Sequence, residues 1–374
     1  MRRIPLCKLV SFICITLAVI VYFSIINNPR INQTDYVERK PAISGLRKTT
    51  PSAITRTVDR IVLSFVVCDS RFNESLNVVK SMLIFTKTPV HLVIFTEDDL
   101  MSKFKDVLTQ WRRLTSNQLD FELHKINFPE AHKEDWMNLF RKCAAQRLFI
   151  PELMTHIDSL IYVDTDTLFL GPADELWSYF FKFNSSQISA LALEDNNPNL
   201  SWYPRFAKHP FYGKLGLNSG VMLMNLTRMR GFGWTEYITP IMLKWKLNIP
   251  WGDQDIINII FHHHERAVLE LSCRYNYRSD QCMYGDACAD ATHDGIFLLH
   301  GNRKTFHNDK QPAFEAIYRA VEEYEIGTDP AEAFLSNLDK YFTEAPQSNC
   351  GNLKDAFLKV PVDTLSHMYE TTVR

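Results

Sequence analysis

The chain has 374 residues, of which 46% are hydrophobic and 22% charged, and its formal net charge is −2. This length suits one large domain or two ordinary ones, and the ordinary glycine and proline contents exclude a chain dominated by disorder. The charge is nearly balanced, so it gives no reason to expect nucleic acid or an acidic polymer as a partner.

The N-terminal segment is typical of a membrane anchor. Residues 1–8 contain three basic residues, and the 18 residues of 9–26 contain no charge. A helix of that length, at about 1.5 Å per residue, spans about 27 Å, which is close to the thickness of a bilayer core. We predict a cytoplasmic tail (1–8) and an uncleaved transmembrane signal-anchor (9–26), with the rest of the chain in the lumen. A cleaved signal peptide is the alternative, but the run ends in a poor cleavage site.

Potential glycosylation sites follow this anchor. Five N-x-S/T sequons are present, and we expect modification at four of them, Asn32, Asn73, Asn184 and Asn199. The fifth, Asn225, falls in a predicted strand and is expected to stay unmodified.

The cysteines also fit an oxidising compartment. Two of the eight lie in or before the anchor, and the other six can form disulfides in a lumen. Cys273, Cys282 and Cys288 are close in sequence, so we expect at least one bridge among them. The chain has no Cys-x-x-Cys pair, which argues against a structural zinc site.

Residues 27–58 are polar and contain three prolines, which predicts a lumenal stem. From residue 61, short β-rich runs alternate with segments of helical spacing. Strands are predicted at 61–67, 90–95, 121–126, 159–163, 188–193, 220–225 and 296–299. Helices are predicted at 73–85, 100–114 and 136–153, with a further helix-like run at 256–261. This alternation predicts a single α/β catalytic domain (59–345) with a mainly parallel sheet, followed by a C-terminal tail (346–374).

Two carboxylates follow one of the predicted strands. Asp164, Thr165 and Asp166 come directly after the strand 159–163, and ligands of open α/β sheets bind at the carboxyl ends of strands. Oxygen ligands of this kind suit Mn²⁺ or Mg²⁺, which leave positions open for phosphate oxygens. We therefore predict a divalent metal that neutralises a departing diphosphate. The alternative is a surface turn, because Asp-x-Asp is a common pattern.

A third metal ligand is expected from a different strand. His300 ends the predicted strand 296–299, and Gly301, Arg303 and Lys304 follow it. The glycine lets a ligand approach the backbone closely, and the basic side chains can bind phosphate. The alternative is an ordinary strand end with solvated basic residues.

Four further residues are candidates for contacts with sugars. Asn218 precedes a predicted strand and can bond to sugar hydroxyls, although asparagine is also an ordinary turn residue. Asp253 and Gln254 open a helix-like run and can lie beside the transferred sugar, although acidic residues also cap helices. Trp251 can stack on an acceptor sugar.

Several motifs in one order resemble those of glycosyltransferase family 8, the glycogenin-like retaining transferases. They are Tyr-Val-Asp-Thr-Asp (162–166), Asn-Ser-Gly-Val (218–221), Trp-Gly-Asp-Gln-Asp (251–255) and His-Gly-Asn-Arg (300–303). Within the family, the chain looks most like the glucoside xylosyltransferase group, a match carried by residues 142–149, 202–210, 212–214 and 309–314. The resemblance covers about Ile61 to Tyr324.

This resemblance implies a GT-A, Rossmann-like fold, UDP-xylose as donor, and Mn²⁺, with Mg²⁺ possible. It implies transfer of xylose, with retention and in α1,3 linkage, onto O-linked glucose of EGF-like repeats such as those of Notch. Together with the anchor, it places the enzyme in the Golgi or endoplasmic reticulum membrane. Two alternatives remain: another family 8 retaining transferase (a xyloside xylosyltransferase or a glucosyl- or galactosyltransferase), and an inactive lumenal lectin or scaffold. The intact pair of aspartates and the histidine argue against an inactive protein.

Motif positions also imply roles for individual residues. The metal ligands are Asp164, Asp166 and His300. The donor contacts are Cys68, Asp69, Arg147, Asp164, Thr165, Asp166, Asn218, Ser219, Gly301 and Lys304. The catalytic residues are Gln254 and Asp253, and the acceptor contacts are Trp251 and Trp202. This chain departs from the family after His300, where His-Tyr-x-Gly-x-x-Lys-Pro-Trp is usual, and the departure bears on Lys304. Because Gln254 is an amide and a poor nucleophile, same-face attack is expected rather than a covalent intermediate.

Overall fold

The computed structural model describes residues 59–116, 118–139 and 143–373. The predicted cytoplasmic tail, signal-anchor and stem, together with Asn32, lie outside the described residues. Among the described helices, none combines the length and the apolar character needed to cross a membrane.

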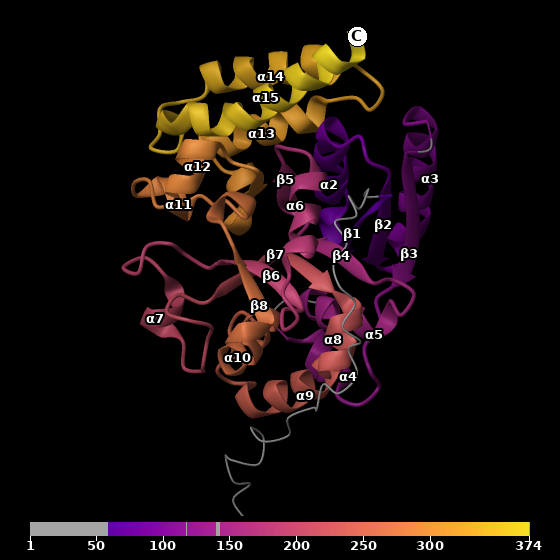
Figure 1. The fold of residues 1–374 in the computed structure, drawn as a ribbon, viewed down its shortest axis with the longest axis vertical. Coiled ribbons are helices and arrows are strands. Elements are labelled where there is room, and N and C mark those ends of the chain that lie inside the picture. Colours follow the sequence, from indigo (N-terminus) through magenta and orange to yellow (C-terminus); the bar gives the residue numbers. More distant parts are fainter. Residues whose placement is uncertain (1–58, 117, 140–142, 374) are drawn as a thin grey trace, which may run out of the picture. The chain divides into compact units, whose positions relative to one another are not determined.

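A seven-stranded sheet, in the order β3-β2-β1-β4-β7-β6-β8, forms the centre of the fold (Figure 1). Its strands are β1 (Ile61–Val67), β2 (Val90–Thr96), β3 (Leu119–Lys125), β4 (Ser159–Val163), β6 (Ser189–Leu193), β7 (Leu217–Asn225) and β8 (Val268–Leu271). Strand β7 runs antiparallel to both of its neighbours, and the other four pairs are parallel. The prediction of a mixed, mainly parallel sheet is confirmed.

Strand β4 shows why the apolar runs are continuous rather than alternating. Its side chains point to opposite faces of the sheet in turn. Leu160 and Tyr162 join the hydrophobic core on one face, whereas Ile161 and Val163 join the core on the other. Because both faces are covered by helices, apolar residues are favoured at successive positions from Leu160 to Val163.

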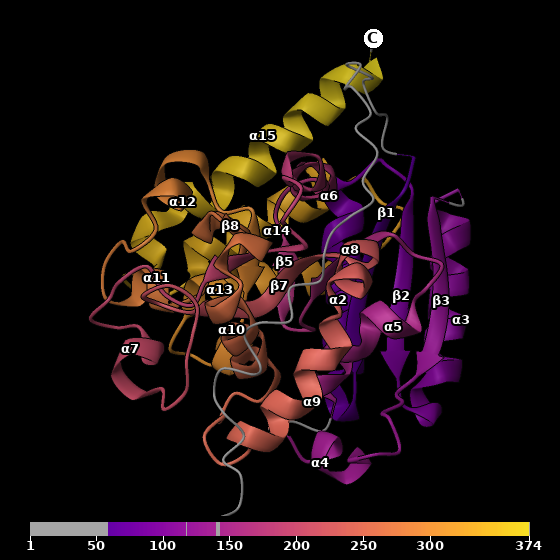
Figure 2. The ribbon, with the colours of Figure 1, turned by 60° about the horizontal axis from the view of Figure 1, so that its bottom comes forward.

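Two groups of helices cover the two faces. The core that contains Ile161 is closed by α2 (Phe72–Phe85), α3 (Asp98–Leu114) and α6 (Ala173–Trp177). The core that contains Leu160 is closed by α4 (Lys133–Met137), α5 (Ile150–Leu153), α8 (Leu226–Phe232), α9 (Trp234–Trp245) and α10 (Asp253–His263). Both ribbon views show α3 beside the edge strand β3 (Figure 1, Figure 2).

A two-stranded sheet carries the rest of the domain. Strand β5 (Thr167–Phe169) pairs antiparallel with β9 (Leu298–His300). A third hydrophobic core lies between this sheet and the C-terminal helices α11 (Asp280–Met283), α12 (Ala289–Asp294), α13 (Pro312–Glu323), α14 (Pro330–Glu344) and α15 (Lys354–Val373). The short helix α7 (Trp202–Phe206) lies in the connection between β6 and β7.

The predicted helix at 136–153 is wrong. Its described parts are the end of α4, a 3₁₀ helix at Ala144–Phe149, and α5. Pro151 has no N–H to donate to the carbonyl of Arg147, and that carbonyl instead accepts from Ile150 in the tighter i→i+3 pattern. Strands β5 and β8 were not predicted, because runs of three or four residues are too short to show the alternating pattern of a strand.

Residues after the predicted domain boundary at 345 pack against the catalytic domain. Helix α15 inserts the fully buried Phe357 into the third core, and the carbonyl of Ala356 accepts from the amide of Ile296 at 2.8 Å. A disulfide joins Cys350 to Cys282. Residues 346–373 therefore form part of the same compact unit as the sheet.

All six cysteines of the described part are paired. The bridges are Cys68–Cys143, Cys273–Cys288 and Cys282–Cys350. The expected bridge among the three neighbouring cysteines is confirmed.

The sequons differ in their surroundings. The side chains of three described asparagines, Asn73, Asn184 and Asn199, are exposed. Asn225 ends β7, and its side-chain oxygen caps α8 by accepting from the amide of Arg228 at 2.8 Å. Glycosylation at any of these positions stays a prediction.

The packing of α15 leads to a stability prediction. Phe357→Ala should lower the free energy of unfolding by about 3–5 kcal/mol, because it empties a fully buried aromatic site. Val362→Ala, on the exposed side of the same helix, is the matched control and should change it by less than about 0.5 kcal/mol. Urea unfolding followed by circular dichroism measures both, and equal effects would show that α15 is not part of the core.

Candidate active site

Main-chain hydrogen bonds shape the turn that carries the two aspartates. Asp164 follows β4, and its amide donates to the carbonyl of Gly220 at 2.8 Å. Asp166 precedes β5, and its carbonyl accepts from Gly301 at 2.7 Å. Because β5 pairs with β9, with Thr167 opposite His300, the turn brings both aspartates next to the histidine at the end of β9.

These three side chains form a candidate metal centre. One ligand atom from each of Asp164, Asp166 and His300 lies within 4.8 Å of the other two. The Nε2 atom of His300 is 3.4 Å from an oxygen of Asp166 and 3.8 Å from an oxygen of Asp164. Two carboxylates and one imidazole suit a divalent ion such as Mn²⁺, with positions left for phosphate oxygens. The predicted ligands are thus brought together by the fold.

A glycine makes room for the histidine. A Cβ atom placed on Gly220 would lie 2.2 Å from Cε1 and 2.6 Å from Nδ1 of His300, far closer than side chains pack. The ring of His300 also meets Asn276, whose side-chain oxygen lies 2.8 Å from Nδ1. This contact leaves Nε2 turned toward the carboxylates.

Arg147 compensates the negative charge of the site. It is buried, and its guanidinium lies 2.7 Å from Asp164 and 2.7 Å from Asp253 while donating to the carbonyl of Ser219 at 2.7 Å. Burial lowers the pKa of Arg147, but the two carboxylates outweigh it and leave the pKa raised. Burial raises the pKa of Asp253 to about 6, although Arg147 opposes this. The arginine therefore stays charged and ties the end of β4 to the start of α10.

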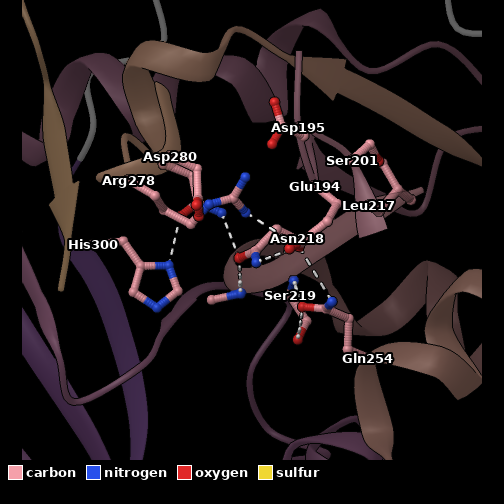
Figure 3. A network of polar contacts seen from close by, with 12 residues as sticks. Glu194, Asp195, Ser201, Leu217, Asn218, Ser219, Gln254, Arg278, Asp280 and His300 are labelled. Atoms are coloured by element: carbon pink, nitrogen blue, oxygen red, sulfur yellow. Dashed lines mark hydrogen bonds and ion pairs between the residues drawn. The ribbon is translucent and has the colours of Figure 1, made fainter. Parts of the chain in front are cut away.

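Gln254 lies one residue further along α10 and has several polar contacts. Its side-chain oxygen accepts from the amide of Ser219 at 3.1 Å. Its nitrogen donates to Glu194 and to the hydroxyl of Tyr203, each at 3.3 Å. The amide is therefore held in one orientation near the start of β7 (Figure 3).

An aromatic cluster lies next to Gln254, whose main-chain amide donates to the carbonyl of Trp251 at 3.3 Å. The rings of Trp202 and Trp251 meet edge to face with centroids 5.7 Å apart, and Phe206, half exposed, is 6.1 Å from Trp202. Buried Asp255 holds this cluster by accepting from the amide of Trp251 at 2.7 Å. The two tryptophans that the sequence assigns to the acceptor thus lie together.

Comparison with known proteins identifies the family. The family model for glycosyl transferase family 8 matches residues 62–305. Mouse (Mus musculus) glucoside xylosyltransferase 1 is 43% identical over 328 residues, which cover 85% of this chain and 81% of that protein. Glucoside xylosyltransferase 2 of Xenopus laevis is 39% identical over 360 residues, 91% of this chain and 85% of that protein.

The chain belongs to glycosyltransferase family 8. This membership confirms the prediction of a UDP-sugar-dependent glycosyltransferase.

Solved structures agree with this assignment at the level of the fold. Mouse xyloside xylosyltransferase 1 in its apo form superposes with a TM-score of 0.51 at 19% identity, over 66% of this chain and 99% of that chain. The galactosyltransferase LgtC, in complex with donor and acceptor sugar analogues, superposes with a TM-score of 0.51 at 15% identity, over 75% and 96% of the two chains. The predicted GT-A fold of this family 8 member is confirmed.

Some predicted donor contacts in this family 8 chain stay predictions. Cys68 is buried in its disulfide, and Asp69 begins a 3₁₀ turn after β1. Thr165 is half-buried between the two metal-site aspartates. Lys304 is exposed in a left-handed conformation with φ of 63°, next to Arg303, which pairs with Asp280.

Sequence reasoning missed four residues that shape the site: Glu194, Gly220, Asn276 and Arg278. Glu194 had a usable signal, because it follows the predicted strand 188–193 as Asp164 follows β4. Asn276 and Arg278 lie in a loop without any motif. Gly220 was read within a family motif and not as a contact of His300.

The close approach at Gly220 leads to a prediction about metal binding. Gly220→Ala should weaken Mn²⁺ binding at least about 10-fold, because the added methyl displaces the ring of His300. Gly231→Ala is the control, since no atom lies within 4 Å of its Cβ position. Electron paramagnetic resonance of free Mn²⁺ gives both affinities, and wild-type affinity in Gly220→Ala would exclude this role.

The His209–Asp255 pair predicts a pH dependence of stability. The two side chains are fully buried and 3.2 Å apart. Burial lowers the pKa of His209, but the hydrogen bond and the negative charge of Asp255 raise it by more. The pKa of the folded state therefore lies above that of a free histidine. The pair's stabilisation is therefore complete below the unfolded pKa of about 6.5 and is lost as pH rises through the folded pKa.

Unfolding free energies between pH 6 and pH 8.5 test this. The wild type should lose more stability over that range than His209→Gln, whose side chain does not titrate. Parallel curves for the two proteins would contradict the assignment.

Proposed function

We propose that this chain is a glucoside xylosyltransferase that transfers xylose from UDP-xylose, with retention and in α1,3 linkage, onto O-linked glucose of EGF-like repeats of the Notch type. The observation that carries the proposal is the assembled Asp164–Asp166–His300 centre in a chain 43% identical, over 85% of its length, to a glucoside xylosyltransferase 1. The intact ligand set argues against an inactive lectin or scaffold.

Mn²⁺ is the proposed cofactor, with Mg²⁺ able to replace it, held by Asp164, Asp166 and His300. When bound, the ion stabilises the negative charge that develops on the departing diphosphate. Arg147 and Asp253 are proposed to border the donor sugar. Arg147 lies between two neighbouring carboxylates, Asp164 and Asp253, and its positive charge reduces the repulsion between them.

Retention is proposed to proceed by attack from the face that the diphosphate leaves. Gln254 offers an amide whose oxygen already accepts from Ser219, and an amide is a poor nucleophile. The acceptor hydroxyl then gives its proton to the leaving phosphate, while Gln254 and Ser219 hold the sugar's position. Isolation of a glycosyl–enzyme adduct on any side chain would contradict this path.

The acceptor is proposed to lie on the cluster formed by Trp202 and Trp251. Aromatic faces pack against the C–H groups of sugar rings, and a series of contacts, from Trp251 through Gln254 and Ser219 to Arg147, links the cluster to the charged site. The predicted signal-anchor and the sequons support a type II protein of the Golgi or endoplasmic reticulum membrane, with the catalytic domain in the lumen.

A second candidate within the family is a transferase with another donor or acceptor, such as a xyloside xylosyltransferase. The fold similarity to mouse xyloside xylosyltransferase 1 is compatible with it, but at 19% identity it carries no information about substrate.

A donor screen tests the proposed function. With an O-glucosylated EGF-like repeat as acceptor, UDP-xylose should give product, whereas UDP-glucose and UDP-galactose should give little.

Asp166→Asn should lower the rate by about 100-fold or more, the range seen when one strong electrostatic contact is removed. Asp99→Asn, exposed on α3, should be unaffected.

Chelation completes the test. EDTA should abolish transfer and added Mn²⁺ should restore it. A clear preference for another UDP-sugar would replace the xylosyltransferase proposal, and full activity after chelation would remove the metal from it.

A further inference from the structure

A buried polar chain connects the candidate metal centre to a carboxylate with no assigned role. Nδ1 of His300 meets the oxygen of Asn276 at 2.8 Å. The nitrogen of Asn276 donates to the oxygen of Asn218 at 2.8 Å. The nitrogen of Asn218 donates to Oε2 of Glu194 at 2.7 Å. Figure 3 shows Glu194, Asn218 and His300 along this path.

The direction of each hydrogen bond in this chain is determined. The main-chain amide of Gly220 can only donate, and it contacts the side chain of Asn218 at 2.9 Å, so that atom is the oxygen. The nitrogen of Asn218 must then face Glu194. Because Asn276 donates to the same oxygen, its own oxygen faces His300. Nδ1 of His300 therefore carries the proton, and the lone pair of Nε2 faces Asp164 and Asp166.

The same oxygen of Glu194 also holds the catalytic candidate. Oε2 accepts from Gln254 at 3.3 Å and from Arg278 at 3.2 Å, in addition to Asn218. Arg278 is fully buried, and Asn218 is 5% exposed. Three donors therefore converge on one carboxylate oxygen, and each comes from a different element or loop.

We propose that Glu194 is a positioning residue that fixes the metal ligand His300 through Asn218 and Asn276, and fixes Gln254 directly. The proposal rests on the metal centre described under the proposed function. It also gives Asn218 a role that its sequence position does not indicate. The oxygen of its side-chain amide accepts from Gly220 and Asn276, and the nitrogen donates to Glu194.

Mn²⁺ affinity, measured by electron paramagnetic resonance in the presence of UDP, tests the proposal without turnover. Glu194→Leu and Asn276→Leu should each weaken Mn²⁺ binding by about 10- to 100-fold, the usual effect of losing an outer partner of a metal-binding histidine. The double variant should bind Mn²⁺ at most about 3-fold more weakly than the weaker-binding single variant, because one break already interrupts the series of hydrogen bonds.

The isosteric variant separates hydrogen bonding from charge. Glu194→Gln keeps an oxygen for Asn218 and should recover affinity to within about 5-fold of the wild type. Asp195→Asn, the neighbouring buried carboxylate that accepts from the amide of Asn197, is the matched control and should bind Mn²⁺ normally. Wild-type affinity in Glu194→Leu, multiplicative losses in the double variant, or a loss in Glu194→Gln equal to that in Glu194→Leu would each overturn the positioning role.

Two controls distinguish a wrong metal centre from a Glu194 variant that does not fold. Asp166→Ala should lose Mn²⁺ binding; if it does not, the metal centre itself is wrong, whatever Glu194 does. If Glu194→Leu does not fold, because it leaves the Arg278 guanidinium without its carboxylate, the paired change Glu194→Leu with Arg278→Leu removes both charges. That protein should show the same weak Mn²⁺ binding, and normal binding in it would equally overturn the proposal.

Discussion

The arrangement of the site depends on one buried cation. Arg147 lies between Asp164 and Asp253, and without it these carboxylates and Asp166 would place several negative charges at one edge of the sheet. Such repulsion is strong in a poorly hydrated environment. The guanidinium also bonds to the main chain of β7, so that it ties three elements together. Arg147 lies in a 3₁₀ helix, and its carbonyl accepts from Ile150 in the i→i+3 pattern because Pro151 has no N–H to donate.

The overall organisation follows from where the central strands end. The turn after β4 supplies the aspartates, the end of β9 supplies the histidine, and the start of α10 supplies Asp253 and Gln254. Ser219 contacts Arg147 of the charged centre, which is suited to a metal-bound diphosphate, and also contacts Gln254. Gln254 in turn contacts the main chain of Trp251, part of the aromatic cluster that is suited to a sugar acceptor. Transfer requires the two substrates to meet, and hydrogen bonds hold the side chain of Gln254 next to both groups of residues.

Much of this could be predicted from sequence because burial leaves a strong pattern. The apolar run of β4 and the carboxylates after it indicated both the sheet and the metal site. Asn276 and Arg278 could not be found in the same way, because their roles depend on contacts between residues far apart in the chain. The last helix was predicted only as a tail, because the partners of its buried residues, such as Phe357, lie far away in the chain.

The most direct test of the account is anomalous diffraction from crystals of the protein soaked with MnCl₂ and UDP. A single strong manganese peak is predicted between Asp164, Asp166 and His300, within about 2.4 Å of Nε2 of the histidine, with diphosphate oxygens completing its coordination. A peak at a different place, contact through Nδ1 instead of Nε2, or UDP bound with no manganese beside these three residues would contradict the assignment of the active site.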